Sequence, residues 1–184
     1  VHAAILSGAD MVVANDIDRD INSGIDSGDL LADIRRIAES VPDPELVVVT
    51  VGDLGIIRDV RRDGASVEID VTPTYSACPA TLAIELAIET AVAEAGHDVR
   101  VRRVLAPAWT TDWITPAGRA KLKDAGIAPP QRRGDSQTDD DAYFARPQVA
   151  CPRCDSLDTV ELSAFGATAC KAQYRCLSCR EPFD

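Results

Sequence analysis

Four cysteines near the C-terminal end have the spacing of a metal-binding site. Two C-x₂-C pairs are present with twenty-one residues between them: Cys151 with Cys154, and Cys176 with Cys179. Each pair can direct two sulfurs from a tight turn toward one ion, and two such turns complete the tetrahedral S₄ site that Zn²⁺ accepts. A segment this short builds little core of its own, so metal binding would also drive its folding. The pattern predicts a structural zinc ribbon over residues 149–184, with rubredoxin-like iron or an iron–sulfur cluster as open alternatives.

A fifth cysteine, Cys78, lies where a predicted strand meets a predicted helix. It belongs to the stretch Thr74-Tyr75-Ser76-Ala77-Cys78-Pro79, and proline is favoured at the first position of a helix. A thiol at a helix N-terminus faces unpaired amide groups, which favour the thiolate that binds metal or attacks an electrophile. We consider three roles for Cys78: a transient ligand of iron or of an iron–sulfur cluster, which we favour, a packed cysteine at a helix start, and a covalent catalyst.

Further side chains are candidates to act with Cys78. Asp53, in an Asp-Leu-Gly turn, is either a hard oxygen ligand beside the thiol or simply a turn residue. Thr74 and Ser76 either donate hydrogen bonds to the thiolate or cap the helix. Cys170 lies inside the four-cysteine segment, and we interpret it as a small buried side chain in preference to an exchanging metal ligand.

The ferritin-like di-iron pattern and two nucleotide-binding motifs are missing from the sequence. His2 and His97 are the only histidines, and only His97 follows a glutamate at the Glu-x-x-His spacing. A ferritin-like di-iron site needs two such motifs, so this chain cannot build one. Neither a Gly-x-Gly-x-x-Gly motif nor a Walker loop occurs. A nucleophilic cysteine usually needs a histidine base, and His97 is expected at the far end of the helix that follows Cys78. We therefore expect no catalytic residues and no enzyme activity of this chain itself.

Charge and hydropathy exclude two kinds of partner. The net charge is −11, and residues 1–45 hold ten acidic and three basic side chains. Because nucleic-acid binding depends largely on basic side chains, we expect no nucleic-acid partner. The longest apolar runs are too short to span a bilayer, and no signal peptide is recognisable. We therefore expect a cytoplasmic protein that has no membrane partner and keeps its cysteines reduced.

A helix is predicted ahead of the residues around Asp53. Apolar residues recur at helical spacing from Asp29 onward, and Pro42 and Pro44 end the pattern near Val41. The residues that share this face are Leu30, Leu31, Ile34, Ile37 and Ala38.

Strands and helices then alternate up to residue 130. The β-branched run 46–51 and residues 56–60 are typical of strands, and a turn at Arg62-Asp63-Gly64 leads to the alternating strand 67–71. The helix over residues 80–95 is apolar on most sides, with Glu85 and Glu89 on a narrow solvated stripe. A strand at 99–105 and a helix from Thr115 to Gly126 follow. The order α-β-β-α-β-α predicts an α+β fold, a small sandwich of helices on a short sheet.

Composition divides the chain into four segments. Residues 1–27 are acidic and lack a sustained period, as in a flexible tail, and residues 131–148 are a polar linker. Between them, residues 28–130 form the predicted α/β domain. Residues 149–184 form the predicted tetracysteine module.

Several motifs resemble a known family. Asp43-Pro44-Glu45, Asp53-Leu54-Gly55 and the Thr74–Pro79 stretch are similar to the small domain shared by SufT-like proteins and the eukaryotic cytosolic iron–sulfur assembly factors. Residues 109–115 and 126–130, together with the cysteine module, resemble the PaaD (PaaJ) branch. That branch is a subunit family encoded with the phenylacetyl-CoA oxygenase (epoxidase) components. The resemblance extends over residues 29–184.

The resemblance implies an accessory subunit in aerobic phenylacetate degradation. Such a subunit would assist maturation or assembly of the iron–sulfur or di-iron centres of the oxygenase and reductase subunits. Cys78 matches the family's reactive cysteine, and Asp53 matches its aspartate. The implied cofactors are structural zinc and transient iron or an iron–sulfur cluster. A purely structural adaptor that docks oxygenase subunits is the alternative, a thiol-dependent enzyme is less favoured, and a homo-oligomer stays open.

Overall fold

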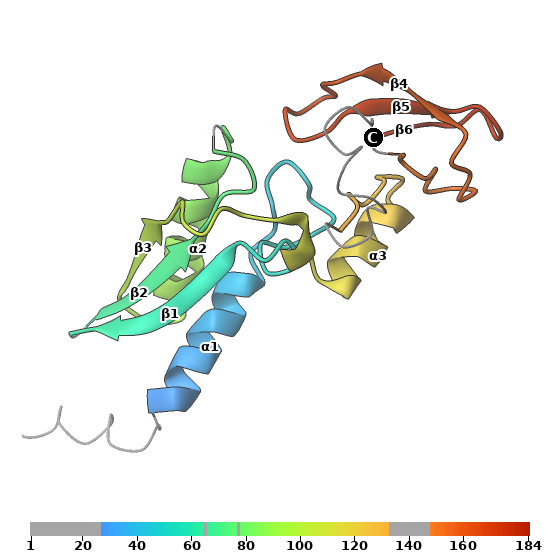
Figure 1. Ribbon diagram of the computed structural model, residues 1–184. Helices are drawn as coiled ribbons and strands as arrows, with labels where there is room; N and C mark the ends of the chain where they lie inside the picture. Colours follow the sequence, from blue (N-terminus) through green and yellow to red (C-terminus); the bar gives the residue numbers. More distant parts are fainter. Residues whose placement is uncertain (1–26, 65, 77, 133–147) are drawn as a thin grey trace, which may run out of the picture.

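The first domain is built on a mixed three-stranded sheet, seen at the left of Figure 1. β1 (Ile57–Asp63) and β2 (Ser66–Val71) are antiparallel, and Gly64 supplies the positive φ, +62°, that their tight turn needs. β3 (Val99–Arg103) lies parallel to β2, and α2 (Thr81–Glu94) makes the crossover that parallel neighbours require. The predicted hairpin and the predicted α+β class are confirmed.

The computed structural model describes residues 27–64, 66–76, 78–132 and 148–184. The predicted acidic tail and most of the predicted linker therefore lie outside the described residues. None of the helices in the described ranges is long and apolar enough to cross a membrane.

The core lies between the sheet and two helices. α1 (Ser27–Glu39) buries Ile34 and Ala38 completely, and Leu30, Leu31 and Ile37 pack against the same cluster, so the predicted apolar face is confirmed. The helix ends at Glu39, ahead of the predicted end at Val41. Other members of the core come from β2 and α2: Val67, Ile69, Val71, Ile84, Ile88 and Val92.

Residues 46–51 do not form the predicted strand. The Asp43 carboxylate accepts hydrogen bonds from the amides of Glu45 and Leu46 at 2.9 and 2.7 Å, and this curls the chain. The Val49 amide then bonds to the carbonyl of Leu46 at 2.9 Å. Only an isolated bridge between Pro42 and Thr50 remains extended. The local carboxylate thus overrides the β propensity of the valines, as Asp side chains do in turns.

The exposed side of α2 differs from the prediction. Glu85 pairs with Arg103 of β3 at 2.7 Å, and Glu89 accepts the amide of Val101 at 3.2 Å, so these acids face the sheet edge. Leu82 and Leu86, one turn apart, are 61% and 54% exposed. The prediction of a solvated glutamate stripe beside covered leucines is wrong, because an arginine side chain and a backbone amide of β3 bind the two glutamates.

A short 3₁₀ helix and α3 connect the first domain to the C-terminal module. η1 (Thr111–Trp113) precedes α3 (Pro116–Asp124), whose N-cap Thr115 accepts the Gly118 amide at 2.9 Å as predicted. β4 (Thr159–Ser163), β5 (Gln173–Cys176) and β6 (Pro182–Phe183) form an antiparallel sheet. Figure 1 shows α3 lying between the two sheets.

Candidate functional site

The two cysteine pairs lie on matching turns of the C-terminal sheet. Each pair is followed by a residue with positive φ, Asp155 at 57° after the first and Arg180 at 67° after the second. The amide of Cys151 bonds to the carbonyl of Ser156, and the amide of Cys176 bonds to the carbonyl of Glu181. These left-handed residues let the chain reverse within a few residues, so both sulfurs of each pair point inward.

The four sulfurs are arranged as ligands of one ion. The ligand atoms of Cys151, Cys154, Cys176 and Cys179 all lie within 4.8 Å of one another. The sulfur of Cys151 is 3.7 Å from that of Cys179, and the sulfur of Cys154 is 3.6 Å from that of Cys176. Four sulfurs bound tetrahedrally at the Zn–S bond length would stand about 3.8 Å apart. These two separations match that spacing, and the donor set therefore fits a tetrathiolate zinc site.

As free thiols, these cysteines titrate unequally. The backbone N–H of Cys179 faces the sulfur of Cys176 at 3.4 Å and is the largest cause that lowers the pKa of Cys176 to about 6. The backbone N–H of Ser156 acts in the same direction on Cys154, but the neighbouring sulfurs and desolvation outweigh it and raise its pKa to about 12. Such a cluster keeps some of its protons at neutral pH, so metal binding must release protons.

The C-terminal sheet is attached directly to α3 and the segment after it. The Ala128 amide donates to the carbonyl of Asp184 at 2.7 Å, and Lys123 pairs with Asp155 at 2.6 Å. Ala128 also packs against the small cluster of Cys151, Cys176 and Phe183. The module is therefore positioned relative to the first domain by the same helix that docks on that domain.

Cys78 lies in the loop between β2 and α2. Its side chain is partly buried and packs against the core of the first domain. α2 begins at Thr81, one residue after the predicted start at Ala80, so Pro79 does not occupy the first helical position; the N-cap Ala80 makes no side-chain capping bond. The carbonyl of Cys78 instead accepts the hydroxyl of Thr81 at 2.9 Å. Cys78 thus precedes the helix by a turn.

The hydroxyls near Cys78 are not linked to its sulfur. In the described part of the chain, neither Thr74 nor Ser76 makes a hydrogen bond to the thiol or a cap to α2. Thr74 and Tyr75 line the same cavity as Cys78, whereas Ser76 does not. Thr74 therefore shares the cavity with Cys78 but makes no bond to its sulfur, and Ser76 lies outside the cavity.

Asp53 holds α3 against the first domain. Its carboxylate accepts Lys121 Nζ at 2.6 Å and the Thr50 amide at 3.0 Å, and it is only 9% exposed. Burial opposes ionisation, but the bonds from Lys121 and Thr50 outweigh it and lower the pKa of Asp53 below 3.8. Asp53 does not line the cavity that Cys78 faces. Its carboxylate is thus engaged in the fold, and a ligand role for it stays a prediction.

The contact around Asp53 is too close for larger residues. A Cβ at Gly118 of α3 would stand 2.8 Å from the carbonyl oxygen of Asp53, and a Cβ at Gly55 would stand 2.5 Å from that of Trp113. The indole of Trp109 donates to the carbonyl of Leu54 at 2.8 Å. The Asp-Leu-Gly turn is thus the point where η1 and α3 dock.

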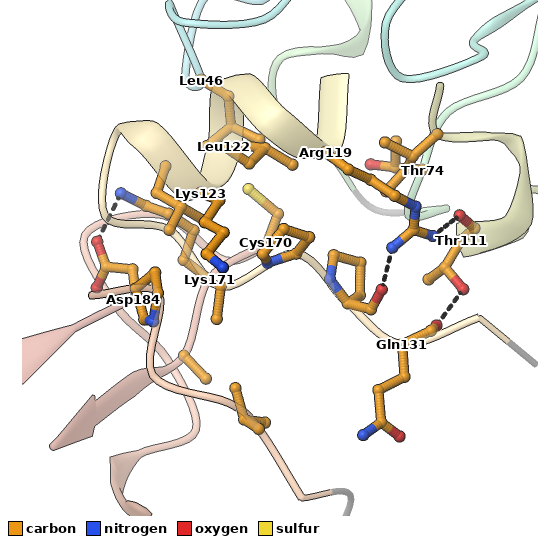
Figure 2. A pocket seen from close by; sticks show the side chains of 18 of the residues that line it. Leu46, Thr74, Thr111, Arg119, Leu122, Lys123, Gln131, Cys170, Lys171 and Asp184 are labelled. Atoms are coloured by element: carbon orange, nitrogen blue, oxygen red, sulfur yellow. Dashed lines mark hydrogen bonds and ion pairs between the residues drawn. The ribbon is translucent and has the colours of Figure 1, made fainter. Parts of the chain in front are cut away.

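A cavity of about 800 Å³ lies between the first domain and the C-terminal module. Both Cys78 and Cys170 line it, together with apolar side chains such as Leu46, Trp109 and Leu122. In Figure 2 the sulfur of Cys170 is turned into the cavity, on the side of Leu46 and Leu122. Cys170 is exposed, so the prediction of a buried side chain is wrong.

Two residues of this cavity were not predicted from the sequence. Glu45 Oε2 lies 3.7 Å from Cys170 Sγ, across 125 positions of the chain. Arg119 spans the rim, where it donates to the carbonyls of Thr111 and Pro130 (Figure 2). The Asp-Pro-Glu motif was the one available signal for Glu45. No pattern in the sequence connected it with Cys170.

The two modules together define a class: an iron–sulfur-cluster-assembly domain followed by a zinc ribbon. The family model described as iron–sulfur cluster assembly protein matches residues 31–105, and the one described as PaaD zinc beta ribbon domain matches residues 135–184.

The chain is also 47% identical over 153 residues to an Escherichia coli (strain K12) protein that is provisionally named as a subunit of 1,2-phenylacetyl-CoA epoxidase. The match covers 83% of this chain and 89% of that protein. The chain belongs to the PaaD family of phenylacetyl-CoA epoxidase subunits, and the resemblance stated from its motifs is confirmed.

Two solved structures are similar to part of the chain. A domain of unknown function from Bacillus anthracis is 23% identical with a TM-score of 0.46, and covers 50% of this chain and 90% of its own. A Mycobacterium tuberculosis protein associated with iron–sulfur complex assembly and repair is 34% identical with a TM-score of 0.32, and covers 58% and 94%.

Proposed function

We propose that this chain is an accessory subunit of a phenylacetyl-CoA epoxidase system, acting in the cytoplasm to load or assemble the iron centres of its partner oxygenase and reductase subunits. The placement of Cys78 carries the proposal. The thiol belongs to the assembly-type domain, is only partly buried, and opens on a cavity beside the ribbon. The relative's name supplies the class of partner.

The surroundings of Cys78 suit a metal-holding thiol better than a catalytic one. A thiolate is a soft ligand that binds iron and iron–sulfur clusters through sulfur alone. Covalent catalysis would need a base within hydrogen-bond reach, and no described histidine lines the cavity. In this proposal the ribbon zinc is structural, and Asp53 contributes by holding α3, which forms part of the cavity wall.

Substitution of Cys78 tests the proposal. The Cys78→Ser variant is co-expressed with the oxygenase and reductase subunits, and iron and acid-labile sulfide are measured in the purified partners. We expect both to fall, with the zinc content of the variant unchanged, because serine is a poor ligand for iron. Thr90→Ala, an exposed change on α2, is the control. Partners that are fully loaded beside Cys78→Ser would refute the proposal.

The second candidate function is a structural adaptor. Leu82 and Leu86 are exposed on one side of α2, and exposed apolar side chains grouped on one face are typical of docking surfaces. This role predicts that Leu82→Glu with Leu86→Glu abolishes co-purification of the oxygenase subunits while Cys78→Ser has no effect. Loss of partner iron in Cys78→Ser, with co-purification intact, would instead favour the loading role.

A further inference from the structure

We propose that the cavity between the two modules contains a second metal site, in which Glu45 and Cys170 together bind one divalent transition-metal ion. The site is separate from the ribbon and uses neither Asp53 nor the four ribbon cysteines. It rests on the function proposed above only in naming Fe²⁺ as its cargo. Metal binding itself can be tested without that function.

The spacing of the two ligand atoms carries the inference. Cys170 Sγ and Glu45 Oε2 are 3.7 Å apart. With a metal–sulfur bond of about 2.3 Å and a metal–oxygen bond of about 2.1 Å, two ligands of a tetrahedral ion stand about 3.6 Å apart. The pair therefore already has the spacing of two ligands on one ion. Sulfur with carboxylate oxygen suits cations of intermediate softness such as Fe²⁺.

Glu45 is held in place by its neighbour. The Asp43 carboxylate, only 7% exposed, accepts the Glu45 amide at 2.9 Å and the Leu46 amide at 2.7 Å. These bonds fix the turn that carries Glu45 toward the ribbon. The carboxylate of Glu45 is left to reach the cavity, where it meets Cys170.

The loop that carries Cys170 is closed by bonds of its own. The Gly166 amide donates to the carbonyl of Lys171 at 2.6 Å, and Lys171 pairs with Asp184 at 3.0 Å. The Thr168 hydroxyl lies 3.1 Å from the Cys170 sulfur. Both ligands are thus presented by loops with internal constraints, so ion binding requires little ordering of the chain.

The thiol proton leaves when the ion binds. Desolvation and the nearby charge of Glu45 raise the pKa of Cys170, so the resting thiol keeps its proton and directs it at the carboxylate. Binding of M²⁺ forms one metal–sulfur and one metal–oxygen bond and releases that proton to water. No electron is transferred in this step.

Two protein ligands make an incomplete site, which suits an ion in transit. Among the described residues, three or more donors come within 4.8 Å of one another only in the ribbon. The remaining positions on the ion would be taken by water or by a partner's ligands. Cys78 lines the same cavity and supplies a further thiol to which the ion can pass.

Cobalt titration of the zinc-loaded full chain tests the site. Co²⁺ binds a given site more weakly than Zn²⁺, so the ribbon keeps its zinc and added Co²⁺ reports other sites. We expect one additional Co²⁺ per chain and a sulfur-to-cobalt charge-transfer band. Cys170→Ser removes the band, and Glu45→Gln weakens binding by at least about tenfold, the lower end of what even outer-shell changes cause. Glu94→Gln, exposed at the end of α2, leaves both unchanged.

Measurements of zinc content and of iron in the partner subunits show whether the second site or the loading function is wrong. The second site is overturned if the wild-type protein shows no charge-transfer band. It is also overturned if Cys170→Ser, Cys170→Ala and Glu45→Gln, each with one zinc retained, show the same band as the wild type. If Cys78→Ser lowers partner iron while Cys170→Ser and Glu45→Gln do not, the loading function stands and the second site as its carrier is overturned. If the band behaves as expected but no variant changes partner iron, the site stands and the loading function fails.

Discussion

Asp53 and Cys78 are the two family residues of the first domain, and their surroundings differ. The Asp53 carboxylate is buried and bonded to Lys121 and Thr50. Cys78 packs on the core and also faces the cavity. We infer that Asp53 acts chiefly on the position of α3, whereas Cys78 is the residue available to a bound ligand.

Asp53→Asn should destabilise the protein in a pH-dependent way. Breaking a buried ion pair costs about 3–5 kcal/mol, but Lys121 is 47% exposed, so solvent screening reduces the expected loss to roughly 1–3 kcal/mol. Because the folded pKa of Asp53 lies below its ordinary 3.8, the carboxylate stabilises the fold at pH values above 3.8. That contribution is lost as the pH falls through the folded pKa.

Urea unfolding of wild type and Asp53→Asn between neutral pH and pH 3 measures this effect. The difference in unfolding free energy should be largest near neutrality and shrink in acid. Lys121→Met provides the matched change on the other partner, and the double variant isolates the coupling between the two. A difference that is constant across the pH range would contradict the ion-pair explanation.

The segment between Asp43 and Val51 shows why one predicted strand was wrong. Its residues Leu46 to Val51 have high β propensity, but β propensity mostly reports the fit to a pleated, half-buried surface. The Asp43 carboxylate bonds to two amides of this segment and so removes them from any ladder. Val49 and Val51 still enter the core, whereas Val47 and Val48 do not.

Paired substitutions at Val48 and Val49 test this arrangement. Val49 is 1% exposed and Val48 is 40% exposed. Val49→Ala should lower the unfolding free energy by roughly 1–3 kcal/mol through lost burial and a cavity, and Val48→Ala should change it by at most about 0.5 kcal/mol. If both substitutions lowered the unfolding free energy equally, both valines would be packed. That result is expected for a strand buried on both faces and would contradict the turn seen in the structure.

Elements whose signals are local were predicted well. The C-x₂-C pairs, the turn at Gly64 and the Thr115 cap each depend on a few adjacent residues, and all occur as expected. The glutamates of α2 were misplaced because their partners lie on β3, in a different part of the sequence. Sequence-based prediction of a side chain's position therefore failed where its bonding partner lies far away in the sequence.

The same limit applies to the whole molecule. The approach of Glu45 to Cys170 depends on α3 docking at Asp53 and on the ribbon docking at Ala128. Sequence spacing does not indicate that two residues will meet when their contact depends on two separate packing contacts between elements. The sequence therefore predicted both modules and the family but not the cavity between them.

Zinc removal should unfold the ribbon and leave the first domain folded. The buried cluster of the ribbon consists of Cys151, Cys176 and Phe183, so two of its three members are predicted metal ligands. Structural zinc sites supply much of the folding free energy of such modules. The core between α1, α2 and the first sheet contains none of these residues and should stay intact.

Hydrogen exchange of the full chain with and without a strong zinc chelator measures this separation. Amides of β4–β6 and the Ala128 amide, which bonds to Asp184, should lose protection, and amides of β1–β3 should keep it. Added zinc should restore the original pattern. Cys170→Ser should respond as the wild type does, because its sulfur is not a ribbon ligand, whereas Cys154→Ser should lose ribbon protection before any chelator is added. Full protection of β4–β6 in protein shown by elemental analysis to hold no metal would contradict a structural role for the zinc.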